Sequence, residues 1–329
     1  MSKIAIVNSS SFGKHFPKHI ETLKSIGAVD FFKYEPNEKS EVLINDLKDY
    51  DYIISSVTPN FRRDFFENTP KLKLISRHGI GYNNIDVQAA TDHNVYVTKV
   101  DAIVEQDAVA ENAIALIMAL SRSIVNAAQA AIEGEWGRRA EFMGFQFRNK
   151  TAGVIGVGNI GSRVAEIFRD GFNMKVYAYD PYLSEAQKNA LPGIVFTDLE
   201  TVVSNADFLS LNAFLDNESY HILDEALLKT MKPTSLIVNT ARGALVDDRA
   251  IIKAIQTGTV AGYAADVVEN EPIDANHYLL QDHRILITPH TSAYTWECLE
   301  GMGDKCVDDV LKVHQNENPT GLINKEMVK

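Results

Sequence analysis

Three polar residues follow predicted strands in the later part of the chain, and their side chains could together perform acid–base chemistry. Arg242 comes after the apolar run SLIVNTA, Glu271 lies beyond TVAGYAADVVEN, and His290 ends the run RILITPH. An arginine can bind a carboxylate or polarise a carbonyl group, and a protonated histidine can supply a proton to a carbonyl oxygen. A carboxylate beside that histidine would orient its ring and favour its charged form. Together the groups suit reduction of a small 2-oxo acid, whereas each taken singly could be a turn, surface or strand-end residue.

A glycine-rich segment is the second chemical signal. It has the spacing G-x-G-x-x-G, follows the strand-like run TAGVIGVG and opens a helix-like run, so backbone N–H groups could face a pyrophosphate. The next predicted strand ends at Asp180, where a carboxylate would bind the ribose hydroxyls and repel the extra phosphate of NADP. The alternative is a tight strand-to-helix turn without a ligand. We expect NAD as the cofactor, bound by Gly156, Gly158, Asn159, Ile160, Gly161 and Asp180.

The elements that must position these residues alternate between strands and helices, which predicts parallel α/β sheets. One series of strand-like runs lies at 3–8, 51–57, 71–77 and 94–98, and a second lies at 151–158, 175–180, 206–212, 235–241, 259–266 and 284–290. An apolar helix from about Asp107 to Ser121 is predicted to connect the two series, and a helix from about Tyr294 to Val313 closes the chain. Because the carboxyl ends of parallel strands line the ligand crevice, this order would bring the polar residues to one edge.

Length and composition narrow the class of protein. The chain has 329 residues, of which 45% are hydrophobic and 23% charged, as expected for an ordinary folded protein of two domains. The net charge of −12 disfavours a nucleic acid or an anionic membrane as partner. Cys298 and Cys306 are predicted to be reduced thiols, and the N-terminus lacks a signal-peptide pattern, so we expect a cytoplasmic protein. The nine histidines form no HExxH or comparable cluster, so we expect no metal site.

Several motifs resemble those of the D-isomer-specific 2-hydroxy acid dehydrogenases, and the resemblance runs over nearly the whole chain. The segments that carry it are SRHGIGYNNID at 76–86, VAENAIALIMALSR at 109–122, GVIGVGNIGSRVA at 153–165, VNTARGALVDDRAI at 238–251, AADVVENEP at 264–272 and TPHTSAYT at 288–295. The resemblance implies an NAD-dependent oxidoreductase that acts on the CH–OH group of 2-hydroxy acids. It also implies that Arg242, Glu271 and His290 form the catalytic set.

The resemblance further implies a fold of two Rossmann-like doubly wound domains. A NAD-binding domain, residues 101–292, is expected as an insertion into a discontinuous, flavodoxin-like substrate-binding domain made of residues 1–100 and 293–329. Backbone N–H groups around Ile80 and Gly81 would hold the substrate carboxylate, and Asp266 would lie near the nicotinamide carboxamide. A homodimer is expected.

Two segments depart from the pattern of the family. The chain reads Lys99-Val100-Asp101 where an Asn-x-Pro turn is usual, and Asn212 stands in the place of a usual histidine, with Phe214 in place of a proline. We nevertheless expect cofactor contacts from Asn212 and from the end of the strand at 235–241, at Thr240 and Ala241.

The residues that would contact the substrate leave several substrates open. Ser56, Val57, His78 and Arg242 are candidates to contact a small 2-oxo or 2-hydroxy acid. A short 3-phosphoglycerate dehydrogenase is an alternative, although the loop at 55–59 has no arginine to bind a phosphate, and Arg62 and Arg63 follow it closely. A NAD-sensing protein that acts like a co-repressor is the alternative from another class.

Overall fold

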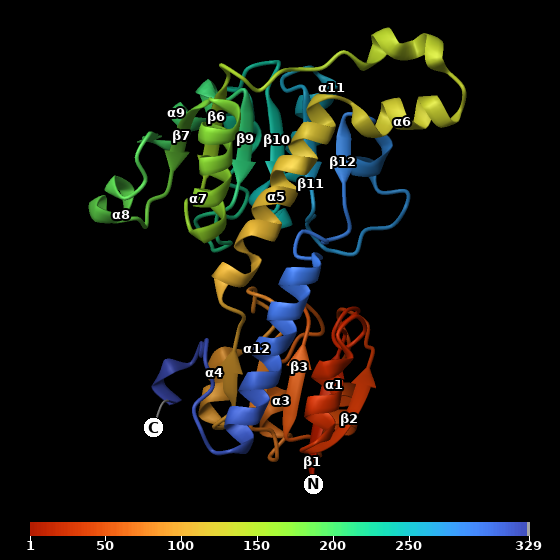
Figure 1. Cartoon of the computed structure of the whole chain (residues 1–329), viewed down its shortest axis with the longest axis vertical. Helices are drawn as coiled ribbons and strands as arrows, with labels where there is room; N and C mark the ends of the chain where they lie inside the picture. The colour runs from red at the N-terminus through yellow and green to blue at the C-terminus, as the bar shows by residue number, and fades with distance from the viewer. Residues whose placement is uncertain (328–329) are drawn as a thin grey trace. The chain divides into compact units, whose positions relative to one another are not determined.

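The computed structural model describes residues 1–327 and contains two parallel sheets with helices on both faces (Figure 1). The chain divides into two compact units. Unit 1 is Met1–Glu105 together with the segment that begins at Tyr294, and unit 2 is Gln106–Ala293. The predicted fold class, two doubly wound α/β domains with one inserted into the other, is confirmed. The division lies at 105/106 and 293/294, where the sequence predicted 100/101 and 292/293.

Unit 1 is built on a five-stranded sheet in the order β2-β1-β3-β4-β5. Its strands are β1 (Ser2–Val7), β2 (Gly27–Phe32), β3 (Tyr52–Ser55), β4 (Leu74–Arg77) and β5 (Tyr96–Thr98). Its helices are α1 (Pro17–Lys24), α2 (Ser40–Leu47), α3 (Arg63–Glu67), α4 (Val87–Asp92) and α12 (Trp296–His314), followed by the 3₁₀ turn η5 (Lys325–Met327). All its strand pairs are parallel.

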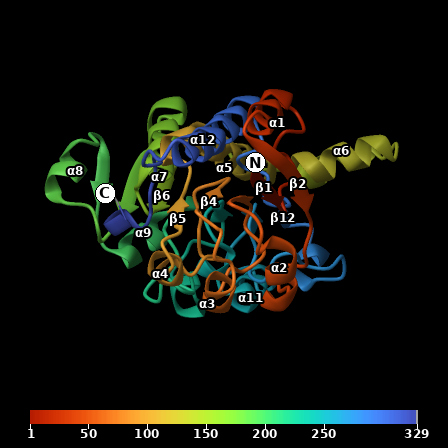
Figure 2. The same cartoon turned by 90° about the horizontal axis from the view of Figure 1, so that it is seen from below.

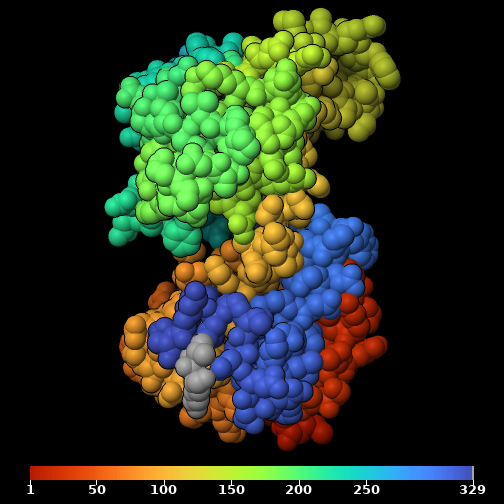
Figure 3. Space-filling view, turned by 60° about the vertical axis from the view of Figure 1, so that its left-hand side comes forward, coloured from red at the N-terminus to blue at the C-terminus, as the bar shows by residue number. Residues whose placement is uncertain are grey.

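Both faces of this sheet are buried, because successive strand side chains point to opposite sides. Ile4 and Ile6 pack with Val310 of α12, whereas Ala5 and Val7 pack with side chains of α2, α3 and α4. The predicted closing helix is therefore present, and it covers one face of a sheet made near the other end of the chain. In the space-filling view, α12 and the segment after it (blue) lie beside the N-terminal residues (red) (Figure 3).

Unit 2 is built on a seven-stranded parallel sheet in the order β12-β11-β10-β9-β6-β7-β8. Its strands are β6 (Thr151–Ile155), β7 (Lys175–Tyr179), β8 (Ile194–Phe196), β9 (Phe208–Leu211), β10 (Leu236–Asn239), β11 (Gly262–Ala265) and β12 (Ile285–Ile287). Its helices are α5 (Ala102–Ser121, beginning in unit 1), α6 (Ile124–Ile132), α7 (Asn159–Glu166), α8 (Glu185–Asn189), α9 (Leu199–Asn205), α10 (Glu225–Leu228) and α11 (Asp248–Gln256). Shorter turns are η1 (Trp136–Phe142), η2 (Ile167–Gly171), η3 (Gly243–Leu245) and η4 (Tyr278–Gln281).

The strand order reverses beside β6, and the chain runs outward from this strand in both directions. Apolar side chains of α5 and α7 cover one face of the sheet, and those of α9, α10 and α11 cover the other. The predicted site residues of unit 2 come after the carboxyl ends of six strands, β6, β7, β9, β10, β11 and β12. This is the geometry that creates a ligand crevice in an open parallel sheet.

The segment of α6 and η1 extends away from the sheet of unit 2 (Figures 1 and 2). This segment, taken to include Met143 at the C-cap of η1, has three large apolar side chains that are mostly exposed, Ile132 (80%), Trp136 (72%) and Met143 (88%). Across residues 1–327, no single helix is both long and apolar enough to cross a membrane, and α5 with α6 reaches that length only as a pair bent by 60°.

Candidate active site

His290 and Glu271 form the central pair of the site. The chain passes His290 just after β12, and Nδ1 of its ring lies 2.8 Å from Oε2 of Glu271. The other carboxylate oxygen accepts a hydrogen bond from the backbone N–H of Val268 at 3.0 Å, so Glu271 is itself fixed. The side chains of His290 and Glu271 are 37% and 32% exposed. The contact with Glu271 orients the ring, and Nε2 makes no hydrogen bond with residues 1–327. An imidazole nitrogen placed in this way could exchange a proton with a ligand.

Asp266 holds the turn that carries His290. Its carboxylate is 1% exposed and accepts five hydrogen bonds from the described residues, all from the turn at 288–292. The shortest come from the hydroxyl and the backbone N–H of Ser292, at 2.5 and 2.6 Å, and from the hydroxyl of Thr288, at 2.6 Å. His290 lies in the middle of this turn with φ of 56°, a conformation that costs a residue with a side chain free energy. The hydrogen bonds to Asp266 therefore stabilise the backbone that aims His290.

The sequence did not predict this use of Asp266, which was expected beside the nicotinamide carboxamide. That contact stays a prediction, and the five accepted hydrogen bonds leave few free lone pairs for it. The signal available in the sequence is the run TPHTS, in which hydroxyl residues flank the histidine on both sides. Three of them, Thr288, Thr291 and Ser292, are the residues that Asp266 binds.

Arg242 lies close to the segment that carries Glu271, because the backbone of the next residue, Gly243, packs against the backbone of Val268. It follows β10 and precedes η3, and its guanidinium donates a hydrogen bond to the carbonyl of Ala241 at 2.5 Å. A side chain at Gly243 would begin only 2.0 Å from the backbone carbon of Val268, so only glycine fits there. The Arg-Gly turn therefore packs directly on the segment that leads into Glu271. The sequence predicted Arg242, Glu271 and His290 as a set, and the structure places all three at neighbouring strand ends of unit 2.

The glycine-rich turn after β6 fits a pyrophosphate. Gly156 has φ of +81°, and a Cβ on Gly161 would lie 1.9 Å from the carbonyl oxygen of Gly156, so both positions require glycine. A Cβ on Gly158 would meet nothing within 4 Å, which means that this residue faces open space. No side chain caps the N-terminus of α7, so the N–H groups of its first turn, including those of Asn159 and Ile160, are available to an anion.

Asp180 lies directly after β7, and its carboxylate stabilises the glycine-rich turn by a hydrogen bond. Its Oδ2 accepts a hydrogen bond from the N–H of Val157 at 2.8 Å, and its Oδ1 accepts one from the N–H of Tyr182 at 3.0 Å. A carboxylate can accept further hydrogen bonds, so these contacts are compatible with the predicted binding of ribose hydroxyls. The residue thus joins the two strand ends that a dinucleotide would span.

The remaining predicted cofactor residues lie at the ends of β9 and β10. Asn212 donates a hydrogen bond from its side chain to the hydroxyl of Ser210 at 3.1 Å. The N–H of Ala241 is bonded to the side chain of Asn239 at 3.0 Å. The hydroxyl of Thr240 is buried without a hydrogen-bond partner in the described chain. A buried hydroxyl of this kind fits a contact that a bound ligand completes.

In unit 1, the turn after β4 presents free backbone donors. The N–H groups of Ile80 and Gly81 make no hydrogen bond within residues 1–327, whereas Gly79 N donates to the carbonyl of Arg77 at 2.9 Å. Two adjacent free N–H groups can bind a carboxylate. The role predicted for Ile80 and Gly81 is compatible with this geometry and stays a prediction.

The other predicted substrate residues of unit 1 differ in their exposure. Val57 is 47% exposed, and Ser56 is fixed by a hydrogen bond from its N–H to the carbonyl of Val7. His78, in contrast, is only 8% exposed and packs edge-on against Phe12. Burial lowers the pKa of His78 to about 3, so its ring is neutral in the folded protein. Its side chain supports the turn from within the core, and a contact with substrate stays a prediction.

Comparison with known proteins gives the family context of this geometry. Residues 114–292 match the family model described as D-isomer specific 2-hydroxyacid dehydrogenase, NAD binding domain. A curated relative, a glyoxylate reductase of Thermococcus litoralis, is 33% identical over 316 residues, which is 94% of each chain.

Two solved structures are similar to this chain over nearly its whole length. The D-lactate dehydrogenase of Escherichia coli, in its apo form, has a TM-score of 0.83 with 30% identity and covers 98% of this chain and 99% of its own. The D-lactate dehydrogenase of Aquifex aeolicus, complexed with NAD and lactic acid, has a TM-score of 0.81 with 27% identity, over 95% and 96% of the two chains.

Proposed function

Because the chain belongs to the D-isomer specific 2-hydroxyacid dehydrogenases, we propose that it reduces a small 2-oxo acid of the glyoxylate type and that His290 supplies the proton. Membership of the family establishes the class of reaction. The chain is an NAD-dependent oxidoreductase that acts on the CH–OH group of 2-hydroxy acids. The substrate and the roles of individual residues in catalysis are what we propose.

The hydrogen bond between His290 and Glu271 is the observation that carries the proposed mechanism. When bound, NADH supplies a hydride to C2 of the substrate. As negative charge develops on the substrate oxygen, Nε2 of His290 gives it a proton. Glu271 keeps the ring oriented through Nδ1. In the oxidation direction, Nε2 takes the proton back from the hydroxyl group.

Arg242 and the free backbone donors account for substrate binding. The planar guanidinium of Arg242 can polarise the C2 carbonyl or bind the carboxylate. In unit 1, the N–H groups of Ile80 and Gly81 would hold a substrate carboxylate. These contacts fix the common part of every 2-oxo acid, so they do not select among side chains.

Support for a glyoxylate-type substrate comes from the curated relatives. Glyoxylate reductases of Thermococcus litoralis and Korarchaeum cryptofilum are 33% and 34% identical to this chain over more than nine-tenths of its length. Glyoxylate has no side chain at C2, so its reduction requires only the contacts common to 2-oxo acids.

A substrate panel tests the proposal. Loss of NADH absorbance is followed with glyoxylate, hydroxypyruvate, pyruvate, branched 2-oxo acids, phenylpyruvate and 3-phosphohydroxypyruvate, with NADPH as the control cofactor. The highest kcat/KM is expected with glyoxylate. Selective turnover of 3-phosphohydroxypyruvate would instead assign a short 3-phosphoglycerate dehydrogenase. Binding of NADH without turnover of any substrate would point to a NAD-sensing protein.

We also propose that the chain forms a homodimer. The supporting observation is the projecting segment of α6 and η1, in which Ile132, Trp136 and Met143 are largely exposed. Exposed apolar side chains gathered on one segment commonly mark a protein interface.

A further inference from the structure

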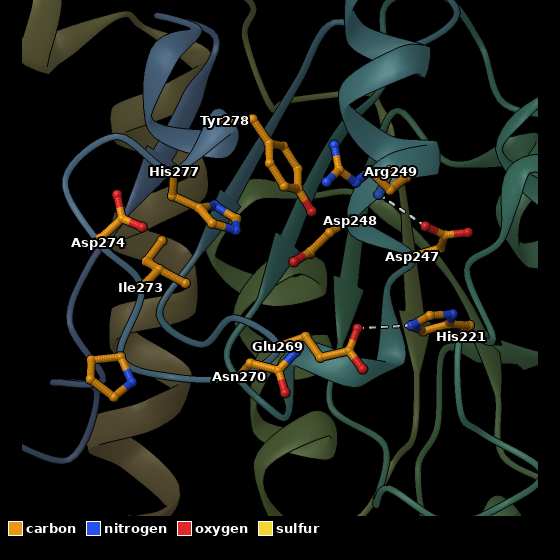
Figure 4. A pocket seen from close by; sticks show the side chains of 11 residues that line it. His221, Asp247, Asp248, Arg249, Glu269, Asn270, Ile273, Asp274, His277 and Tyr278 are labelled. Carbon is orange, nitrogen blue, oxygen red and sulfur yellow. Dashed lines mark hydrogen bonds and ion pairs between the residues drawn. The ribbon is translucent and has the colours of Figure 1, made fainter. Parts of the chain in front are cut away.

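A pocket that the proposed reaction does not use lies within unit 2 (Figure 4). Its volume is about 420 Å³. Four stretches of chain line it: the turn at His221, the start of α11, the loop at 269–274, and the residues His277 and Tyr278. All of them belong to unit 2, so the pocket is complete within one compact unit.

The lining of this pocket is rich in carboxylates. Asp247, Asp248, Glu269 and Asp274 carry negative charge, whereas Arg249 is the one lining side chain with a permanent positive charge. His221 is already engaged, because its Nε2 lies 3.1 Å from a carboxylate oxygen of Glu269. A surplus of carboxylates favours a positively charged occupant.

Asp248 provides the second, independent observation. It is 7% exposed, and its carboxylate accepts no hydrogen bond within residues 1–327. Its neighbour Asp247, in contrast, caps α11 by accepting hydrogen bonds from the N–H groups of Arg249 and Ala250 at 2.9 and 3.1 Å. Figure 4 shows the carboxylate of Asp248 pointing into the space bounded by His277 and Glu269. A largely buried carboxylate that no protein donor contacts would be stabilised by a donor that a ligand brings into the pocket.

The chemistry of the lining identifies the class of ligand. Across residues 1–327, no three histidine, cysteine or acidic side chains converge closely enough to hold a metal ion. The pocket also exceeds the size of a bare ion and includes apolar side chains of Ile273 and Pro272. Nδ1 of His277 is buried without a partner and can accept a hydrogen bond. We propose that this pocket binds a small organic ammonium ion, whose N–H groups donate to Asp248 and whose carbon chain lies against the apolar side.

The position of the pocket gives the proposal a structural consequence. Glu269 and Pro272 line it, and Glu271, which holds His290, lies between them in the chain. A bound ammonium ion would thus contact the loop that positions the carboxylate of the active site.

Titration of the whole chain with putrescine, without substrate or cofactor, tests the proposal. Calorimetry at a pH of about 8, where Asp248 is ionised, is expected to give saturable binding. Asp248→Asn should weaken binding by about tenfold or more, because it removes the only buried negative charge that faces the ligand. Asp274→Asn, in the exposed loop, should weaken it less. Glu185→Gln removes one exposed charge on α8 of the same unit and should leave binding unchanged.

The comparison ligands are butanediol, which lacks charge, and magnesium chloride. Butanediol should not bind, and magnesium should not compete with putrescine at matched ionic strength. The proposal is overturned if putrescine does not bind at up to about 10 mM, if magnesium displaces it, or if Asp248→Asn and Asp274→Asn both bind it as the wild type does. Because no turnover is measured, these outcomes are independent of the proposed reaction.

Discussion

His290 and Glu271 illustrate how single residues divide the work of the site. In the proposed mechanism the imidazole carries the proton, and the carboxylate holds the ring through Nδ1 at 2.8 Å. Replacing His290 with Ala should lower kcat by roughly 100- to 10,000-fold, because the proton donor is lost. NADH binding, measured by fluorescence, should be unchanged. Wild-type turnover in this variant would reject the proposed acid–base role.

Asp180 is predicted to set the preference for NAD. Asp180→Ala removes the carboxylate that would repel the extra phosphate of NADPH, so the ratio of kcat/KM for NADH over NADPH should fall by about tenfold. The variant also frees the N–H of Val157, and NADH should therefore bind more weakly. Kinetics with both cofactors measure the two effects separately. An unchanged ratio would show that another residue excludes the phosphate.

Asp248 should make the stability of the protein depend on pH. Burial, with Glu269 and Asp247 nearby, raises the pKa of its carboxyl from 3.8 to about 6. The folded state therefore binds this proton more tightly than the unfolded state, and the free energy of unfolding falls as pH rises from about 4 to about 6. A shift of this size corresponds to roughly 3 kcal/mol, and hydration of the partly accessible carboxylate should reduce the destabilisation at neutral pH to on the order of 2 kcal/mol.

The variant Asp248→Asn isolates this contribution. Without added amine, it should be more stable than the wild type above a pH of about 6, and the two should converge near pH of about 4. Denaturant unfolding at several pH values measures the difference. A gap that does not change with pH would contradict the assignment.

At the scale of elements, the turn between β12 and α12 depends on one buried carboxylate. Asp266→Asn would place an amide N–H group against the donors of Thr291 and Ser292, so the turn should loosen. We expect a lower melting temperature and a loss of kcat that exceeds the change in the Kd for NADH. Thr291→Val removes only one 3.3 Å contact and should have a much smaller effect. Wild-type kcat in Asp266→Asn would exclude a positioning role.

The same scale explains what the sequence could predict. The central strands are continuous apolar runs such as IAIV and LIVN, buried on both faces, and these were recognised. The strands β2 (GAVDFF) and β8 (IVF) were missed, because β2 begins with a glycine and contains an aspartate, and β8 has only three residues. Strand ends and motifs predicted Arg242, Glu271 and His290 as the catalytic set, and this assignment stays a prediction. The sequence could not predict that Asp266 stabilises the turn at 288–292, or that Asp248 lines a pocket. Both features depend on contacts between segments that are distant in the sequence.

At the scale of the whole molecule, the projecting segment of α6 and η1 is the proposed interface of the homodimer. Light scattering should give the mass of two chains, and Trp136→Glu should shift the protein toward one chain, because a charge would be buried in the proposed interface. Phe31→Glu, at an exposed position of unit 1, is the matched control and should leave the mass unchanged. A wild-type protein with the mass of a single chain would refute the homodimer.

The closing helix has a consequence for synthesis. One face of the sheet of unit 1, with Ile4 and Ile54, is covered by α12, which is made after all of unit 2. Asp309 of this helix also accepts hydrogen bonds from Ser76 and Thr98, more than 200 residues earlier. Unit 2 is continuous and can complete its core while the ribosome is still translating. The N-terminal strands must wait for α12 with an apolar face uncovered, so nascent chains that stall after unit 2 should be the species that most needs a chaperone.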